Sequence, residues 1–363
     1  MMKMKLSLLA CVAVFMALPI NASAGDGHEH DHDRPYNYMP EGGYKSTTGS
    51  QYVEASAKTI LGENEKVAGL FDAAVKDQTL IQRLTERSYW IFTGNYNTTF
   101  YVGDNGVLLL DPLDAGNAPK VLKAIVSVTD KPVHAVVYSH NHADHIDGIN
   151  VFVEYAKKQG HTLDIIATDK TVAKQKFLKS SLPMPTKILP FLGGNIQFEG
   201  QTLRVHGFEH AAHTDDSAMW ILEEEGILHI PDYVNPDQMP FLEFGGSENY
   251  VYYRHNLDAI ANAQWTIFSS GHGNVGRKAD IAFMQEYLND LEHAAKQASS
   301  KVNWDKLFAA QPNNHEALMH SYKVEQARIG TNILRAKYGS YYGFEASVPY
   351  QVGMAAGAMA SYK

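Results

Sequence analysis

Cysteine is almost absent from this sequence, because Cys11 is the only one among 363 residues. It lies in the apolar stretch Leu6–Ile20, which follows two lysines and ends at Ala22-Ser23-Ala24. A basic start, an apolar stretch and a small-residue cleavage site are typical of a secretory signal peptide. We therefore predict that residues 1–24 are removed and that the protein is periplasmic or secreted. The mature chain would then lack disulfides, thiolate metal ligands and a cysteine nucleophile.

Two other interpretations of this N-terminal stretch are weaker. A membrane anchor would need an apolar span of ~20 residues without a cleavage site, so we expect no stable membrane anchor. A lipoprotein acylation site at Leu8-Leu9-Ala10-Cys11 would place the cysteine at the start of the apolar stretch, whereas it belongs at the end.

Runs of basic residues are also missing. The formal net charge is −9, and removal of Lys3 and Lys5 with the signal would change it to −11. Nucleic-acid binding depends on Lys and Arg side chains that neutralise phosphates, so we expect no nucleic-acid partner. Hydrophobic residues make up 45% of the chain, enough for the core of one large or two modest domains.

The segment 139–145 reads Ser-His-Asn-His-Ala-Asp-His, directly after the apolar run Val133–Tyr138. Histidine is the commonest metal ligand, and nitrogen and carboxylate ligands suit a zinc ion with an open coordination position. A strand that ends in this loop would point alternate side chains at two adjacent metal positions. A solvated polar loop is the alternative, but three histidines and an aspartate so close together favour a metal site.

His-x-His-x-Asp-His resembles the signature of the metallo-beta-lactamase superfamily. Three later segments resemble the family's remaining elements: His213-Thr-Asp-Asp-Ser, the strand that ends at Asp232, and the turn Ser-Gly-His272-Gly. The chain departs from the family at Pro231, where many members carry glycine. His210 is a rival to His213, although only His213 precedes threonine.

The resemblance implies a dinuclear site with two zinc ions per chain. The first zinc would be bound by His140, His142 and His213, and the second by Asp144, His145 and His272, with Asp232 shared between them. Asp144 would also serve as a catalytic proton shuttle. The implied fold is an αββα sandwich of two mixed β-sheets flanked by helices. A separate histidine-rich segment, 28–33, either binds zinc weakly or is a solvated tail.

The order of apolar patterns predicts an α/β chain with several strands. Together with the signal and the resemblance, it implies four parts. They are the signal 1–24, an N-terminal extension 25–80, a metallo-beta-lactamase-fold domain 81–298 and a C-terminal helical extension 299–363. Strands are expected at 89–93, 98–102, 107–110, 133–138, 163–167, 202–206, 217–222, 226–230 and 265–268. Helices are expected at 55–61, 67–76, 80–87, 117–127, 147–158, 169–179, 251–262, 279–297 and 315–337. The small apolar end 354–360 could cap the core, pair subunits or wall the substrate site.

The expected function is zinc-dependent hydrolysis of a carboxylic ester, lactone or amide by a metal-bound hydroxide. The loops 94–97 and 233–250 would border the site. The second loop carries Tyr233, Phe241, Phe244 and Tyr250 but no Lys or Arg, which favours a small-molecule substrate that is uncharged or partly apolar. Alternatives are beta-lactam ring hydrolysis and a non-catalytic periplasmic metal-binding or accessory role. The oligomeric state stays open.

Overall fold

Two mixed β-sheets form the centre of the computed structural model, which describes residues 45–362. The larger sheet has seven strands in sequential order, with antiparallel pairing from β3 to β6 and parallel pairing from β6 to β9. Its strands are β3 (Thr79–Arg83), β4 (Ser88–Thr93), β5 (Tyr96–Val102), β6 (Val107–Leu110), β7 (Val133–Val137), β8 (Asp164–Thr168) and β9 (Lys187–Leu189). The predicted signal 1–24 and the histidine-rich segment 28–33 lie outside the described residues.

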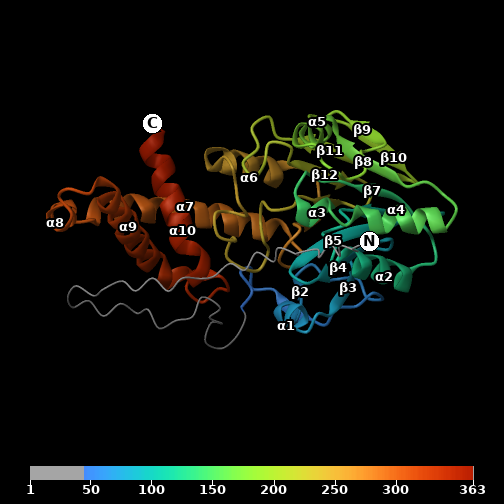
Figure 1. Ribbon diagram of the computed structural model, residues 1–363. Helices are drawn as coiled ribbons and strands as arrows, with labels where there is room; N and C mark the ends of the chain where they lie inside the picture. The colour runs from blue at the N-terminus through green and yellow to red at the C-terminus, as the bar shows by residue number, and fades with distance from the viewer. Residues whose placement is uncertain (1–44, 363) are drawn as a thin grey trace, which may run out of the picture. The chain divides into compact units, whose positions relative to one another are not determined.

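The smaller sheet has five strands, also in sequential order. Figure 1 labels three of them, β10, β11 and β12. Its first four strands are antiparallel, and β14 runs parallel to β13. The strands are β10 (Asn195–Phe198), β11 (Gln201–Gly207), β12 (Ala218–Leu222), β13 (Ile227–His229) and β14 (Ile267–Ser269).

The two sheets pack face to face through one apolar cluster. Trp90 and Val137 of the larger sheet and Trp220 and Ile227 of the smaller sheet all belong to this cluster and are fully buried. Because strands β6 to β8 are covered on both faces, apolar residues predominate in them and do not alternate with polar residues.

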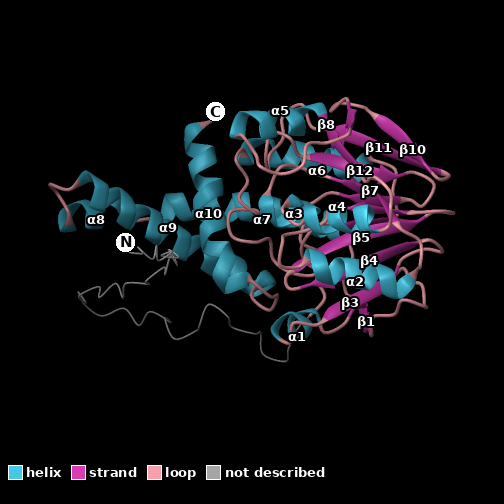
Figure 2. Cartoon of the chain, turned by 45° about the vertical axis from the view of Figure 1, so that its right-hand side comes forward, coloured by secondary structure: helices cyan, strands magenta, loops and turns pink. Residues whose placement is uncertain are grey.

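Helices cover the outer face of each sheet, as Figure 2 shows for α2 and α4. Apolar residues of these two helices, such as Ile125 and Phe152, pack with Val136 of the larger sheet. On the smaller sheet, Leu257 of α6 and Leu288 of α7 pack with Leu228. The predicted αββα sandwich is therefore confirmed. The helices of the sandwich are α2 (Ala118–Val128), α3 (Ala143–Ile146), α4 (Ile149–Lys158), α5 (Asp169–Leu178), α6 (Tyr253–Asn262) and α7 (Lys278–Lys301).

The segment before β4 differs from its prediction. It contains β1 (Gln51–Val53), β2 (Glu65–Val67), a short α1 (Leu70–Val75) and β3, so the helices predicted at 55–61 and 80–87 were wrong. Apolar residues at three- and four-residue spacing do favour a helix locally. Residues 79–83, however, pair along their whole length with β4, and this pairing overrides the local preference. The helix predicted at 67–76 is shortened because Gly69 has a φ of 71°.

The C-terminal extension consists of α8 (Trp304–Ala310), α9 (His315–Tyr338) and α10 (Phe344–Ser361), which follow α7 (Figure 2). Both α9 and α10 pack against α7. The small apolar end of the chain forms part of α10, in which Val348, Val352 and Ala355 are fully buried. Within residues 45–362, no helix combines the length and apolar character needed to span a membrane.

Candidate metal centre

The seven predicted ligands lie together, although they come from four separate segments of the chain. His140, His142, Asp144 and His145 follow β7, and His213 lies between β11 and β12. Asp232 follows β13, and His272 follows β14. They form two groups, and within each group the candidate ligand atoms lie within 4.8 Å of one another: His140, His142, His213 and Asp232 in the first, and Asp144, His145 and His272 in the second.

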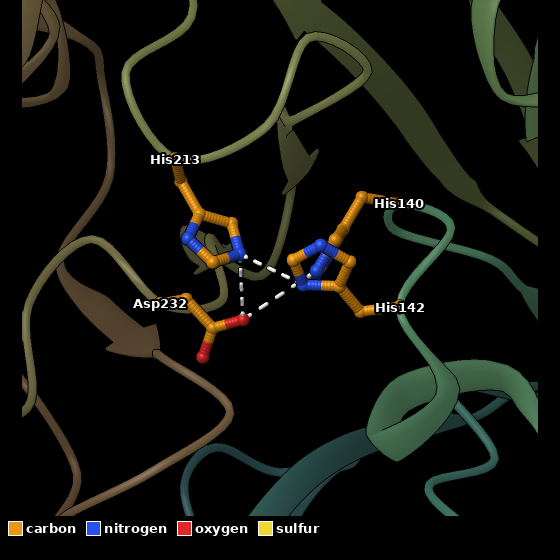
Figure 3. Close-up of side chains that lie close together, drawn as sticks. All are labelled: His140, His142, His213 and Asp232. Atoms are coloured by element: carbon orange, nitrogen blue, oxygen red, sulfur yellow. Dashed lines mark hydrogen bonds and ion pairs between the residues drawn. The ribbon is translucent and has the colours of Figure 1, made fainter. Parts of the chain in front are cut away.

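In the first group, three imidazole nitrogens and one carboxylate oxygen converge, as Figure 3 shows. Nε2 of His213 lies 3.1 Å from Nδ1 of His142 and 3.2 Å from Oδ2 of Asp232. Nε2 of His140 lies 3.4 Å from the same oxygen and is buried with no hydrogen-bond partner among the described residues. A buried polar atom without a partner needs an explanation, and a cation between these ligands supplies one.

The second group is open toward solvent on one side. Nε2 of His272 lies 3.4 Å from Oδ2 of Asp144, and Nε2 of His145 lies 3.5 Å from that same oxygen. Asp232 also reaches this group, with Oδ2 3.0 Å from Nε2 of His145 and Oδ1 3.1 Å from Nε2 of His272. One carboxylate therefore contacts both groups, as required of a shared ligand.

Hydrogen bonds orient the imidazoles so that a fixed nitrogen faces the centre. Nδ1 of His272 donates to the carbonyl oxygen of Asn95 at 3.0 Å, which leaves Nε2 free for a metal. Nδ1 of His140 lies 3.0 Å from Oγ of Ser139, and Oγ donates to Asp111 at 2.6 Å. Such outer partners typically set the tautomer of a ligating histidine.

Asp111 is a buried residue of the site that was not predicted from the sequence. It accepts hydrogen bonds from the backbone N–H of Ser139 at 2.7 Å and from Nε2 of His229 at 2.8 Å. Oδ2 also lies 3.3 Å from Nδ1 of His145. The available signal was an aspartate directly after the apolar strand β6. His229 supports the ligands through Asp111.

The charges favour neutral imidazoles at His140 and His142 and an ionised carboxylate at Asp232. Burial lowers the pKa of His140 well below its usual value, and the imidazoles of His145 and His213 lower it further. Burial would raise the pKa of Asp232, but the same two histidines hold it well below its usual value. Burial likewise opposes ionisation of Asp111, yet His229 and His145 lower its pKa to about 2. Neutral imidazoles and carboxylates are the forms that bind metal ions.

The structure distinguishes His213 from His210. His213 is fully buried and belongs to the first group. The exposed ring of His210 stacks on Tyr252 at 4.7 Å, and its carbonyl oxygen accepts a hydrogen bond from Asn256. His210 therefore lies outside both ligand groups.

Local backbone conformation places the ligands of the smaller sheet. Asp232 has a φ of 68°, in the left-handed region that is costly for residues other than glycine. Pro231 before it is accommodated in this turn and does not displace the carboxylate. In the turn around His272, Gly271 has a φ of 79°, and a Cβ there would lie 2.6 Å from Cε1 of His145. Only glycine allows this close approach.

A cavity of about 580 Å³ opens beside the two groups and is lined by His142, Asp144, Asp232 and His272. The loops predicted to border the site contribute Tyr96 and Phe241 to its lining. The other three aromatic residues of the loop 233–250 belong to, or pack against, the apolar cluster beneath α6 and α7: Tyr233, Phe244 and Tyr250. No Lys or Arg of the described chain lines the cavity.

Comparison with known proteins is consistent with this geometry. A family model of the metallo-beta-lactamase superfamily matches residues 91–285, more than half of the chain and all seven candidate ligands. The chain belongs to the metallo-beta-lactamase superfamily. Asp111 also lies within the matched residues, whereas α1 and the helices α8 to α10 lie outside them.

One curated relative is subunit beta of a 2,4-dinitroanisole O-demethylase from Nocardioides sp. (strain JS1661). It is 23% identical over 232 residues, which are 62% of this chain and 68% of that protein. Among solved structures, a metallo-beta-lactamase from Pontibacter korlensis is similar with a TM-score of 0.49 and 16% identity, over 58% of this chain and 99% of that chain. Metallo-beta-lactamase IND-7 has a TM-score of 0.49 and 21% identity, over 58% of this chain and 98% of that chain.

Proposed function

We propose that this protein is a dinuclear zinc hydrolase that cleaves a carboxylic ester, lactone or amide. The observation that carries the proposal is the arrangement of seven nitrogen and oxygen ligands in two groups that share Asp232 beside a cavity. Nitrogen and carboxylate ligands without thiolate are the donor set of hydrolytic zinc sites. Two bound zinc ions would supply a hydroxide nucleophile at neutral pH and polarise the substrate carbonyl.

The side chains have separate tasks in this proposal. His140, His142 and His213 hold one ion, Asp144, His145 and His272 hold the other, and Asp232 lies between them. The side chain of Asp144 is 36% exposed and lines the cavity, so it is placed to accept a proton during the reaction. Asp111 fixes the orientation of His145 directly and of His140 through Ser139.

The substrate that we propose is a small molecule without negative charge. The carboxylates of Asp144 and Asp232 line the cavity, and no described Lys or Arg there offers a charge-assisted hydrogen bond to an anion. This composition favours an uncharged or partly apolar ester over a beta-lactam, which carries a carboxylate. The signal-like N-terminal sequence supports a periplasmic or secreted location, without a nucleic-acid partner.

Cleavage of an aryl ether is a second candidate. The curated relative is named as an O-demethylase of 2,4-dinitroanisole, which is an aryl methyl ether. In this chain, aromatic side chains line the cavity, including Phe71, Phe92, Tyr96 and Tyr342.

A substrate panel on the zinc-loaded protein tests the proposal. It contains an aryl ester, a lactone, an anilide, an aryl methyl ether and a beta-lactam, each assayed before and after chelation and after return of zinc. We expect zinc-dependent turnover of the ester, lactone or anilide. Turnover of the ether alone would establish the second candidate, and turnover of the beta-lactam alone would make the protein a beta-lactamase. Turnover of none would favour a metal-binding accessory role.

A further inference from the structure

Part of the cavity wall is built by segments of the chain outside the family match. Leu70 and Phe71 of α1, before residue 91, line the cavity, and so does Tyr342 in the turn between α9 and α10, after residue 285. The rings of Phe71 and Tyr342 lie 3.9 Å apart between centroids and are inclined by 34°. Two segments about 270 residues apart thus meet as one aromatic surface beside the metal centre.

Hydrogen bonds fix the C-terminal side of this surface. The carbonyl oxygen of Tyr342 accepts from the backbone N–H of Met239 at 2.9 Å. The side chain of Gln351 in α10 donates to the carbonyl oxygen of Pro240. Both bonds hold the loop that carries Phe241, which lines the same cavity. The turn that presents Tyr342 is therefore attached to a loop of the catalytic domain.

The N-terminal side is fixed to the turn that carries His272. The side chain of Asn274 accepts from the backbone N–H of Val67 at 3.0 Å and donates to the carbonyl oxygen of Val67 at 2.9 Å. Val67 ends β2, and α1 begins three residues later. The position of Phe71 is thus linked to the position of a candidate ligand.

We propose that Phe71 and Tyr342 form a recognition surface for a planar aromatic group of an uncharged ester substrate. This inference rests on the proposed hydrolase function and names the substrate class of the same site. Aromatic groups pack against aromatic side chains in offset or edge-to-face geometry, which stabilises them beyond the burial of area alone. A substrate aligned on the ring pair presents its ester group toward His142, Asp144 and His272 across the cavity.

A matched pair of esters tests this surface. Benzyl acetate and cyclohexylmethyl acetate share the acetyl group and a CH₂–O leaving group, and they differ in the planarity of the ring. The variants are Phe71→Leu and Tyr342→Leu, which remove a ring, and Tyr342→Phe, which retains it. Phe177→Leu is the matched control, because Phe177 lies in α5, is 83% exposed and does not line the cavity.

Loss of either ring should raise KM for benzyl acetate about 3- to 10-fold, with kcat nearly unchanged, because aromatic pairing is a modest interaction. KM for cyclohexylmethyl acetate should change by less than about 2-fold, because its ring is not aromatic and does not take part in aromatic pairing. Phe177→Leu should match the unaltered protein, and Tyr342→Phe, which keeps the ring, should raise KM for benzyl acetate less than Tyr342→Leu does. Equal changes for both esters, or no change for benzyl acetate, would overturn the recognition surface.

A binding measurement separates this inference from the hydrolase proposal. The probe is 4-phenyl-2-butanone, in which a CH₂ replaces the ester oxygen of benzyl acetate, titrated by calorimetry into zinc-loaded protein. Weaker binding in both leucine variants, without hydrolysis of either ester, would preserve the aromatic surface and reject ester hydrolysis as the function. Hydrolysis of both esters with unaltered probe binding in the variants would reject the surface alone. If the protein neither hydrolyses the esters nor binds the probe, the aromatic surface and ester hydrolysis are both rejected. Zinc content and thermal unfolding show whether each variant is folded.

Discussion

The two ligand groups differ in how deeply they lie and in what holds them. In the first group the side chains of His140 and His213 are 1% and 0% exposed. In the second group those of His272 and Asp144 are 23% and 36% exposed. The first group is thus buried except at His142, which lines the cavity together with Asp232, whereas the second group faces the cavity through Asp144 and His272. We infer that the first group anchors the centre and that the second group is the more accessible to a substrate.

The supports of the two groups differ in part, because Asp111 orients His145 of the second group as well as His140 of the first. Ser139 and Asp111, which orient His140, are fully buried at the ends of neighbouring strands. His272 depends on a backbone carbonyl at Asn95 and on a turn attached to the N-terminal segment through Asn274. A change at a residue that supports a ligand should therefore affect the two groups unequally.

Replacement of a ligand in the first group should have the largest effect. His213→Ala removes a nitrogen from the buried group and should abolish nearly all hydrolysis. Loss of an outer partner typically weakens metal affinity ~10–100-fold, and loss of a ligand should exceed that. Zinc content by elemental analysis and turnover of the best substrate check this.

The matched control is His210→Ala, because His210 lies three residues earlier in the same loop but stacks on Tyr252. It should retain two zinc ions and most of the turnover. If metal content collapses in His210→Ala and survives in His213→Ala, the ligand assignment in this loop is wrong.

Removal of the buried charge of Asp111 should have the next largest effect. Asp111→Asn disturbs the orientation of both His140 and His145 without removing a ligand. Zinc affinity should fall by about 10- to 100-fold, which is the range for outer partners of metal ligands. Competition with a chelator of known affinity measures it. Wild-type affinity in a folded Asp111→Asn protein would contradict this support role.

Changes behind the turn that carries His272 should affect stability more than metal binding. The ammonium group of Lys66 is 1% exposed and lies 2.7 Å from Asp280, and it donates to the carbonyl oxygen of Val275 at 2.6 Å. Lys66→Met leaves Asp280 buried without its cation and should lower the free energy of unfolding by about 3–5 kcal/mol. Urea denaturation of the metal-free protein measures this loss.

The control is the double variant Lys66→Met/Asp280→Leu, which removes both buried charges and should recover most of the lost stability. In either variant the first group should keep its zinc ion. A loss of metal from the first group before the second would contradict the unequal dependence of the two groups.

The sequence predicted which seven side chains lie together, because four of them share one short motif after β7 and two others, Asp232 and His272, follow short apolar strands. Asp111 was missed because a single aspartate after a strand has no distinctive spacing, and its role depends on His145 and His229 lying nearby in space. The short strands β9 and β10 and helix α8 were also missed. The helix predicted at 80–87 was wrong because its pairing partner, β4, decides the conformation and cannot be read from local periodicity.

The aromatic wall was beyond sequence reasoning for the same physical reason. Phe71 and Tyr342 are ordinary residues in their own segments, and only the packing of α9 and α10 on α7 brings the second toward the first. The apolar end of the chain was predicted, as one of three possible roles, to form a wall of the substrate site. The residue that lines the cavity is in the turn before α10 instead, while the buried residues of α10 itself pack in the apolar cluster beneath α6 and α7.

Metal stoichiometry tests the central claim most directly. The purified mature protein, saturated with zinc and freed of unbound metal, is measured by elemental analysis and by native mass spectrometry. The two ligand groups that share Asp232 predict two zinc ions per chain, with loss of the first-group ion in His213→Ala. One ion per chain at saturation, or iron as the metal that co-purifies with the protein, would contradict the dinuclear zinc centre.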